Sequence, residues 1–315
     1  MIPALSLLAF SLGFHVGDMM DGVKGWAMRH VADTDWGARR MATAFLAPVR
    51  VSDPDEWKAA GLSPRTIPLD LRNGYWTQGL FVAANGPAKG TVLLLHGYAN
   101  CKDVTATFAK RLHDAGYSTL SFDMRGHGSS SAAFCTFGYS EKADVTAVLD
   151  VLQEQGIARP PFMVVGTSMG AAVGIQAMEN EHRLCTGVFD SSYDALKHVA
   201  PKWLRDSGIN NPDPVYRAAK SLTGAPIESV SPVESLHRVD RPVFILHGTD
   251  DCMIPEQEAE ALYASSPSPA KRILRIEHGN HSEALAEGHP WSDSVWKAVI
   301  DFLNTNTPTQ PTHNT

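Results

Sequence analysis

The chain has 315 residues, of which 43% are hydrophobic and 19% are charged. This is a globular composition, which excludes disordered, collagen-like and coiled-coil proteins. Twenty-seven basic against 34 acidic residues give a net charge of -7, and the chain contains no run of Lys or Arg. Because a phosphate backbone is bound through clustered positive charge, the sequence predicts no nucleic-acid partner.

The four cysteines are widely separated, at Cys101, Cys135, Cys185 and Cys252. They form no CxxC pair and no tight group with histidine, so neither a zinc site nor a disulfide framework is indicated. We therefore expect no metal and a location in the reducing cytoplasm.

Residues 2–14 form an apolar run, IPALSLLAFSLGF. It is shorter than the roughly 20 residues that span a bilayer. It also lacks the preceding basic residue and the cleavage site of a signal peptide. We expect a helix that covers a hydrophobic cleft, and the alternative is a weak anchor at a membrane surface.

The next segments predict first helices and then a hairpin. Residues 41–64 are mixed in character and are expected to be helical in pieces. Two extended runs, 65–71 and 75–84, are joined across Asn73-Gly74, which is a strong hairpin signal.

From residue 91 onward, short apolar runs alternate with amphipathic stretches. The runs predict strands buried on both faces, at 91–95, 118–122, 162–165, 187–189, 243–246 and 273–276. The stretches predict helices at 104–115, 144–155, 169–179, 257–264 and 292–303. This alternation is typical of βαβ units and predicts an α/β fold with a doubly wound, mostly parallel sheet.

One long insertion and the two ends define the domain organisation. Residues 191–240 lack a buried strand and contain four prolines, so we predict a small helical cap inserted in a catalytic domain that spans 65–303. Residues 1–64 are a helical extension, and the polar tail 304–315 is expected to be disordered.

The strongest local motif is Gly166-Thr167-Ser168-Met169-Gly170. It follows the predicted strand FMVV and opens a helix rich in Ala and Gly. A sharp turn of this kind lifts a serine hydroxyl above the strand ends, where it can act as a nucleophile. A glycine-rich packing turn is the alternative reading of the same pattern.

A serine nucleophile needs a base and a group that orients the base. Asp250 and Asp251 follow the strand VFIL, whereas His278 and His281 follow the strand ILRI. The residues alone do not decide between the members of each pair. A metal site built on the two histidines is disfavoured because they lie in a loop rather than on a helix.

The developing oxyanion needs two hydrogen-bond donors. We expect them to be the backbone N–H groups of Met169 and of Tyr98, which follows the strand TVLLL. The ring of Tyr98 is expected to line an acyl pocket, and the alternative is an aromatic side chain at the surface. Asp123 and Arg125 are predicted to fix a loop through hydrogen bonds and not to transfer protons.

With LLLHGY, FDMRGHGSS, GTSMG, ILHGTDDCMIP and EHGNHSE in this order, the chain resembles the α/β-hydrolase superfamily. It is most similar to the compact bacterial serine-esterase branch, which is related to serine-aminopeptidase-like hydrolases. The resemblance implies Ser168 as nucleophile, Asp251 as acid, His281 as base, and Tyr98 and Met169 as oxyanion donors. Related enzymes with aspartate or cysteine at the nucleophile position, such as epoxide hydrolases and dienelactone hydrolases, fit less well.

The sequence thus predicts a serine hydrolase that cleaves carboxylic esters without a cofactor. Its expected partner is a small-molecule ester with an apolar acyl group. A thioesterase, an acyltransferase or a peptidase would use the same triad. An alternative from another class is a non-catalytic binding module on the hydrolase scaffold.

Overall fold

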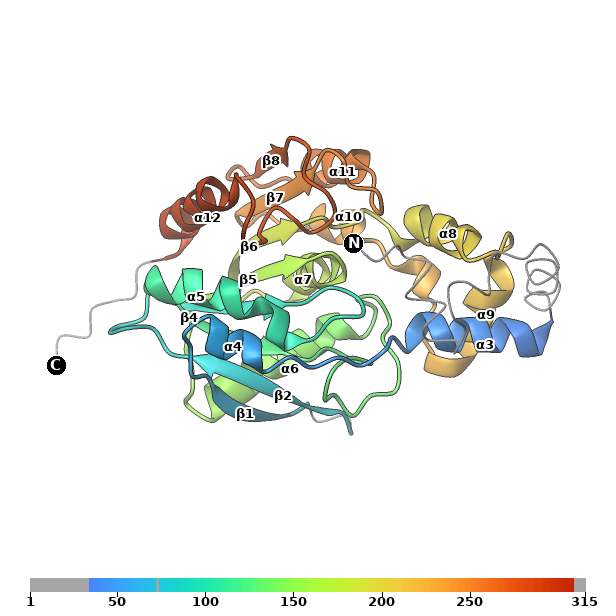
Figure 1. Cartoon of the computed structure of the whole chain (residues 1–315), viewed down its shortest axis with the longest axis horizontal. Helices are drawn as coiled ribbons and strands as arrows, with labels where there is room; N and C mark the ends of the chain where they lie inside the picture. The colour runs from blue at the N-terminus through green and yellow to red at the C-terminus, as the bar shows by residue number, and fades with distance from the viewer. Residues whose placement is uncertain (1–33, 72–73, 309–315) are drawn as a thin grey trace.

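The structure is a computed structural model, and it describes residues 34–71 and 74–308. Its centre is an eight-stranded sheet in the order β1-β2-β4-β3-β5-β6-β7-β8 (Figure 1). The strands are β1 (Arg65–Asp70), β2 (Trp76–Val82), β3 (Thr91–Leu95), β4 (Ser118–Phe122), β5 (Phe162–Thr167), β6 (Leu184–Asp190), β7 (Val243–Gly248) and β8 (Arg272–Ile276). Strand β2 pairs antiparallel with β1 and β4, and the remaining pairs are parallel. The predicted doubly wound, mostly parallel sheet is confirmed.

The helices lie on both faces of this sheet and at one of its ends. They are α3 (Asp35–Leu46), α4 (Asp55–Ala59), α5 (Ala106–Asp114), α6 (Glu141–Glu154), α7 (Met169–Asn180), α8 (Leu196–Asp206), α9 (Asp213–Thr223), α10 (Pro232–Leu236), α11 (Glu256–Ser265) and α12 (Ser292–Asn306). Short 3₁₀ turns, η2 (Lys102–Thr105) and η3 (Ile227–Ser229), complete the described elements.

Two apolar cores sandwich the sheet because side chains alternate along each strand. On β3, Leu93 and Leu95 join the core that contains residues of α6, α7 and α11. Val92 and Leu94 join the opposite core, under α4, α5 and α12. All four side chains are fully buried, which explains why the run TVLLL is continuously apolar.

Residues 191–240, the predicted cap, contain α8, α9, η3 and α10 and no strand. Helices α8 and α9 lie together at one end of the molecule, where α9 packs against α3 (Figure 1). Helix α10 instead packs against α7 and α11 on the face of the sheet. The insertion therefore has an outer part, α8 and α9, and an inner part, α10.

The end of the last helix differs from the sequence prediction. Helix α12 continues to Asn306, so residues 304–306 are helical although the tail was predicted to begin at 304. The Thr186 hydroxyl of β6 donates to the Asn306 backbone carbonyl, and the side-chain amide of Asn306 donates to the Phe302 carbonyl. The first of these bonds fastens the final turn to the sheet, and the second lies within the helix. The apolar run 2–14 and residues 309–315 lie outside the described residues.

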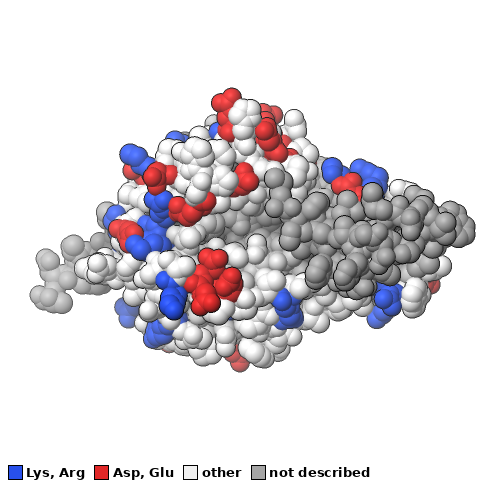
Figure 2. Space-filling model, in the orientation of Figure 1, with Lys and Arg blue, Asp and Glu red and all other residues white. Residues whose placement is uncertain are grey.

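Among the helices that the structure describes, none is both long enough and apolar enough to cross a membrane. On the face shown in Figure 2, Lys and Arg side chains are interspersed with Asp and Glu side chains. This mixture agrees with the modest net charge of -7.

Candidate active site

Ser168 occupies the sharp turn between β5 and α7. Its backbone adopts φ 52° and ψ -120°, a left-handed conformation that costs a non-glycine residue about 1–3 kcal/mol. The turn is tight enough to require glycine on both sides of it. A Cβ atom on Gly170 would lie 2.2 Å from the Leu95 carbonyl oxygen, and one on Gly166 would lie 2.5 Å from the Gly170 carbonyl oxygen. The strained turn presents the serine at the carboxyl edge of the sheet, as the motif predicted.

Ser168, His281 and Asp251 form a chain of hydrogen bonds. His281 Nε2 is 2.9 Å from Ser168 Oγ, and His281 Nδ1 is 2.8 Å from Asp251 Oδ2. A carboxylate accepts a hydrogen bond, so it fixes the tautomer with the proton on Nδ1 and leaves Nε2 to accept from the serine hydroxyl. The three side chains come from the carboxyl ends of three parallel strands, β5, β7 and β8, which meet at one edge of the sheet.

The carboxyl group of Asp251 is fully buried, and its second oxygen is also engaged. Oδ1 accepts the backbone N–H groups of Met253 and Ile254, both at 2.9 Å. Burial acts to raise the pKa of Asp251, but the hydrogen bond from His281 and its charge, together with the two amides, outweigh burial and lower it. The group is therefore ionised at neutral pH.

Asp250 and His278, the residues that the sequence left as alternatives, lie elsewhere. They form a pair of their own, with Asp250 Oδ2 3.2 Å from His278 Nδ1. Their side chains are 59% and 79% exposed. The structure thus brings Asp251 and His281, and not their neighbours, to Ser168. His278 and His281 contact different partners, so the two rings do not converge on a common metal site.

A buried carboxyl group that sequence reasoning missed supports the loop that carries His281. Asp190, at the end of β6, accepts hydrogen bonds from the Ser191 hydroxyl at 3.1 Å and the Leu285 amide at 3.4 Å. The Ser191 oxygen in turn accepts the Ser282 amide at 3.0 Å. Burial raises the pKa of Asp190 to about 7. Its place after a buried strand, at the edge of the sheet where sites form, was the available signal.

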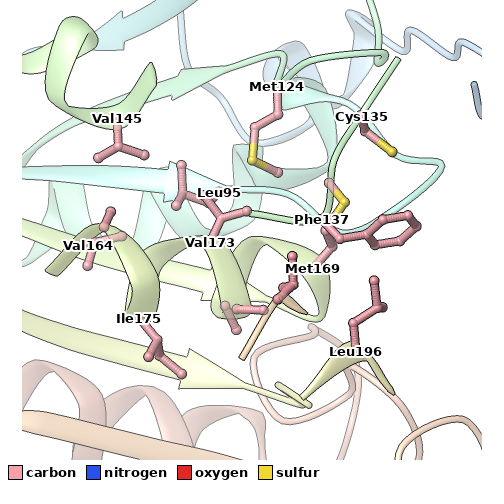
Figure 3. Close-up of a cluster of buried hydrophobic side chains, with 14 of the residues drawn as sticks. Leu95, Met124, Cys135, Phe137, Val145, Val164, Met169, Val173, Ile175 and Leu196 are labelled. Carbon is pink, nitrogen blue, oxygen red and sulfur yellow. The ribbon is translucent and has the colours of Figure 1, made fainter. Parts of the chain in front are cut away.

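The residues predicted as oxyanion donors flank Ser168. Met169 is the first residue of α7, and its side chain lies beside Phe137 in an apolar cluster (Figure 3). On the other side, a Cβ atom on Gly97 would lie 3.4 Å from Ser168 Cβ, so the backbone that leads into Tyr98 runs past the serine. His96 Nδ1 is 2.8 Å from the Gly97 carbonyl oxygen. That carbonyl belongs to the same peptide unit as the Tyr98 N–H.

The Tyr98 ring belongs to a group of aromatic side chains to which α3 contributes Phe45. It stacks on Phe137 with ring centroids 5.5 Å apart, and Phe137 stacks on Phe45 at 4.8 Å. The Tyr98 hydroxyl donates to the Phe45 carbonyl at 3.1 Å. The N-terminal extension therefore contributes directly to the surroundings of the loop that carries Tyr98, which the sequence did not reveal.

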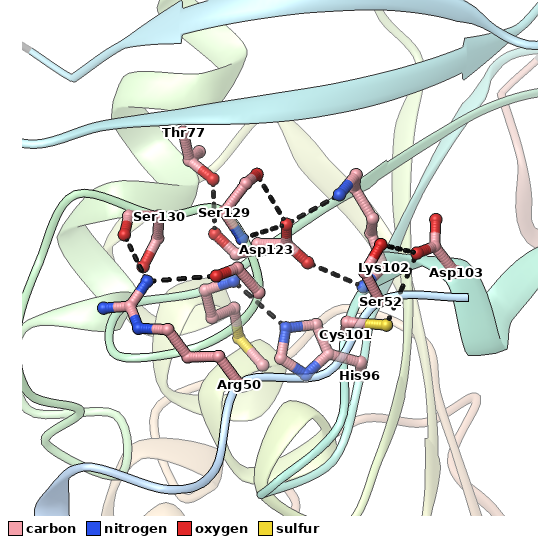
Figure 4. Close-up of polar contacts among 12 residues, drawn as sticks. Arg50, Ser52, Thr77, His96, Cys101, Lys102, Asp103, Asp123, Ser129 and Ser130 are labelled. Carbon is pink, nitrogen blue, oxygen red and sulfur yellow. Dashed lines mark hydrogen bonds and ion pairs between the residues drawn. The ribbon is translucent and has the colours of Figure 1, made fainter. Parts of the chain in front are cut away.

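Asp123 holds its loop through hydrogen bonds, as predicted (Figure 4). Its carboxyl group accepts from the Ser129 amide and hydroxyl, both at 2.8 Å, and forms an ion pair with Lys102 at 2.7 Å. Burial acts to raise the pKa of Asp123, but the hydrogen bonds from Lys102 and Ser129 outweigh it and lower it. Arg125 pairs with Asp144 on α6.

Within the described part of the chain, one group of His, Asp and Glu is compact enough to hold a metal ion: Asp194, His198 and Glu258. Asp194 Oδ1 is 2.7 Å from His198 Nδ1, and the Asp194 amide donates to Glu258 at 2.8 Å. Asp194, His198 and Glu258 therefore already have hydrogen-bond partners within the protein.

Comparison with known proteins finds a matching family model and several relatives. A family model described as "Serine aminopeptidase, S33" matches residues 86–207. The uncharacterised protein YfhR of Escherichia coli is 25% identical over 262 residues, which cover 81% of this chain and 84% of the relative. Caffeoylshikimate esterase of Arabidopsis thaliana is 26% identical over 267 residues, which cover 70% of this chain and 79% of the relative.

Solved structures share the fold. An esterase of Pyrococcus furiosus superposes with a TM-score of 0.68 at 21% identity, covering 84% of this chain and 98% of that one. The monoacylglycerol lipase of Paleococcus ferrophilus superposes with a TM-score of 0.55 at 19% identity, covering 73% and 99%. With the sheet order and these similarities in agreement, the chain has the α/β-hydrolase fold.

Proposed function

We propose that the protein is a serine hydrolase that cleaves carboxylic esters through an acyl-serine intermediate and needs no cofactor. One observation carries the proposal: the unbroken hydrogen-bond chain from Asp251 through His281 to Ser168, at 2.8 and 2.9 Å. A non-catalytic binding module would have no use for a strained serine aligned with a base and an ionised acid.

The reaction follows from these contacts. Ser168 Oγ attacks the ester carbonyl carbon while its proton passes to His281 Nε2. Asp251 keeps the imidazole in the required tautomer and stabilises the imidazolium that forms. The imidazolium then protonates the departing alkoxide, which leaves the acyl group on Ser168. A water molecule then attacks the acyl carbon and gives a proton to His281. His281 returns that proton to Ser168 Oγ as the acyl–oxygen bond breaks and the acid is released.

Two backbone amides, those of Tyr98 and Met169, stabilise the negative charge that develops on the carbonyl oxygen. Both flank Ser168, one in the loop after β3 and one at the N-terminus of α7. A donor aimed at an oxyanion lowers the barrier by roughly 3–4 kcal/mol. The partial positive charge at the N-terminus of α7 acts in the same direction.

We further propose that the acyl group is apolar. The aromatic group of Tyr98, Phe137 and Phe45 adjoins the oxyanion loop, and Met169 joins apolar side chains beside it (Figure 3). Two proteins similar to this chain carry names of ester-cleaving enzymes, caffeoylshikimate esterase and monoacylglycerol lipase.

Thioesters and amides can be cleaved by the same triad, so the substrate test compares leaving groups. Purified protein is assayed on p-nitrophenyl esters from acetate to decanoate, on matched acyl thioesters and on aminoacyl anilides. We expect the highest kcat/KM on esters, with a preference for an apolar acyl chain. Faster turnover of the thioester or the anilide would reassign the reaction.

The residue test is Ser168→Ala, with Ser229→Ala as the matched control because the Ser229 hydroxyl is exposed and bonds the Pro226 carbonyl. We expect Ser168→Ala to reduce kcat by roughly 10⁴-fold or more. Ser229→Ala should behave as wild type. Ester hydrolysis by Ser168→Ala above about one hundredth of the wild-type rate would overturn the proposal.

A further inference from the structure

The loop that carries the Tyr98 amide contains a strained residue, Ala99. Its φ is 57°, in the left-handed region, where an alanine is disfavoured by about 1 kcal/mol or more. Such a conformation persists only where the surrounding structure holds it. The Ala99 amide donates a hydrogen bond to Nε2 of His127 at 3.1 Å. This bond fixes the peptide unit that joins Tyr98 to Ala99.

The two contacts of His127 define its protonation state. Nδ1 is 2.7 Å from the Arg125 carbonyl oxygen, which can only accept a hydrogen bond, so Nδ1 carries a proton. Nε2 receives the Ala99 N–H, which can only donate, so Nε2 is unprotonated. Burial and the neighbouring His96 lower the pKa of His127 to about 3, and the neutral ring is therefore maintained at neutral pH.

His96 fixes the preceding peptide unit, the one between Gly97 and Tyr98, in a similar way. Its Nε2 accepts the Met124 amide at 3.0 Å, so its Nδ1 carries the proton and donates to the Gly97 carbonyl. The His96 and His127 rings lie edge to face with centroids 5.0 Å apart, and His127 also meets the Tyr98 ring edge to face at 5.8 Å. Two neutral imidazoles thus hold the two successive peptide planes on either side of Tyr98.

We propose that His127 is a positioning residue for the oxyanion donor: its unprotonated Nε2 holds Ala99 in the left-handed conformation and thereby keeps the Tyr98 N–H aimed at the oxyanion. The inference rests on the proposed function, in which that amide binds the tetrahedral intermediate. His127 touches neither the nucleophile nor the substrate in this account, and it acts only through the backbone of the loop.

The first test compares two variants of His127 that differ in the acceptor. His127→Phe keeps a planar ring and removes the acceptor, whereas His127→Gln can place a carbonyl oxygen near the position of Nε2. The matched control is His113→Phe, because His113 on α5 also bonds a backbone carbonyl, that of Ala83 at 2.9 Å, away from the oxyanion loop. Folding of each variant is checked by thermal melting.

Misplacing one oxyanion donor is expected to lower kcat by roughly 10²-fold. We therefore expect this loss in His127→Phe with KM within about twofold of wild type, because the lost interaction is made only in the transition state. His127→Gln should recover at least a tenth of the wild-type kcat, and His113→Phe should equal wild type. A folded His127→Phe with kcat within threefold of wild type would overturn the inference. Equal losses in the phenylalanine and glutamine variants would also overturn it.

The second test needs no variant, so it applies even where His127 variants do not fold. It examines the tautomer of His127 that the inference requires. Long-range ¹H–¹⁵N correlation spectra of the uniformly labelled protein report the tautomer of each imidazole. We expect a neutral His127 ring with Nδ1 protonated and Nε2 free, unchanged between pH 5.5 and 8.5. A ring protonated at Nε2 could not accept from Ala99, and that spectrum would refute the inference.

Failure of this inference and failure of the proposed function are distinguishable. If Ser168→Ala keeps its activity, the serine mechanism itself is wrong. If Ser168→Ala is inactive while folded His127→Phe is fully active, the serine mechanism stands and His127 has no positioning role.

Discussion

Two aspartate–histidine pairs are built from the same two loops, those that follow β7 and β8, yet they differ in almost every physical respect. Asp251 and His281 are 2.8 Å apart, with side chains 0% and 16% exposed. Asp250 and His278 are 3.2 Å apart, with side chains 59% and 79% exposed. Residue type and separation in sequence do not distinguish the pairs, whereas burial does.

The two pairs differ in how far each carboxylate is removed from water. The exposed pair is screened by water and salt, and such pairs contribute about 0–1 kcal/mol. The carboxylate of Asp251 is removed from water and instead accepts three hydrogen bonds, from His281 and from the amides of Met253 and Ile254. It can therefore orient the imidazole and stabilise its charge with little rearrangement.

The largest expected effect separates the two histidines. His281→Ala should reduce kcat on a p-nitrophenyl ester by roughly 10⁴- to 10⁶-fold, because the serine loses its base. His278→Ala should stay within twofold of wild type. Steady-state kinetics on both variants measures the contrast, and a comparable loss in the two would erase the distinction between the pairs.

The second prediction compares the two aspartates. Asp251→Asn should lower kcat by roughly 10⁴-fold, since an amide in place of the carboxylate favours the wrong tautomer of His281. Asp250→Asn, the same chemical change one residue away, should leave kcat unchanged. Near-normal turnover by Asp251→Asn would show that another group orients the base.

The contrast between buried and exposed pairs extends to stability. Lys102→Met strands the Asp123 carboxylate in the interior, so it should lower the free energy of unfolding by about 3–5 kcal/mol. Lys110→Met breaks the exposed pair with Asp114 and should cost less than about 1 kcal/mol. Urea unfolding of both variants at pH 7 provides the measurement. Equal midpoints would contradict the importance given to burial.

The last prediction concerns Asp190 and the dependence of stability on pH. Its pKa is near 3.8 in an unfolded chain and about 7 in the fold, so the folded state binds the extra proton between these values. This group therefore makes the protein less stable as pH rises from about 4 to 7, by at most about 1.4 kcal/mol per pH unit. Asp190→Asn should remove that component. Unfolding curves at pH 5, 6, 7 and 8 test it, and an unchanged difference between wild type and variant at all four values would contradict the assignment.

Much of the framework could be predicted because it depends on local pattern. Continuous apolar runs such as Thr91–Leu95 identify strands buried on both faces, and the glycines around Ser168 identify the turn. The order of serine, acid and base follows from the order of the strands that carry them. These features are readable because each is set by neighbours in the sequence.

The remaining features depend on contacts that the sequence does not encode locally. Lys102 and Asp123 are 21 residues apart, and their pairing is visible only when two loops meet. Phe45 on α3 reaches the loop that carries Tyr98, and nothing in its own segment indicates this. The residues alone left Asp250 and Asp251 equivalent, because the direction of each side chain is decided by the turn.

The rate at which a fluorophosphonate labels Ser168 tests the central claim most directly. Labelling is followed by peptide mass spectrometry in wild type, Asp250→Asn and Asp251→Asn. The account predicts a single adduct on Ser168, formed at the wild-type rate in Asp250→Asn and at least about 100-fold more slowly in Asp251→Asn. An adduct on another residue, or equal rates in the two variants, would contradict it.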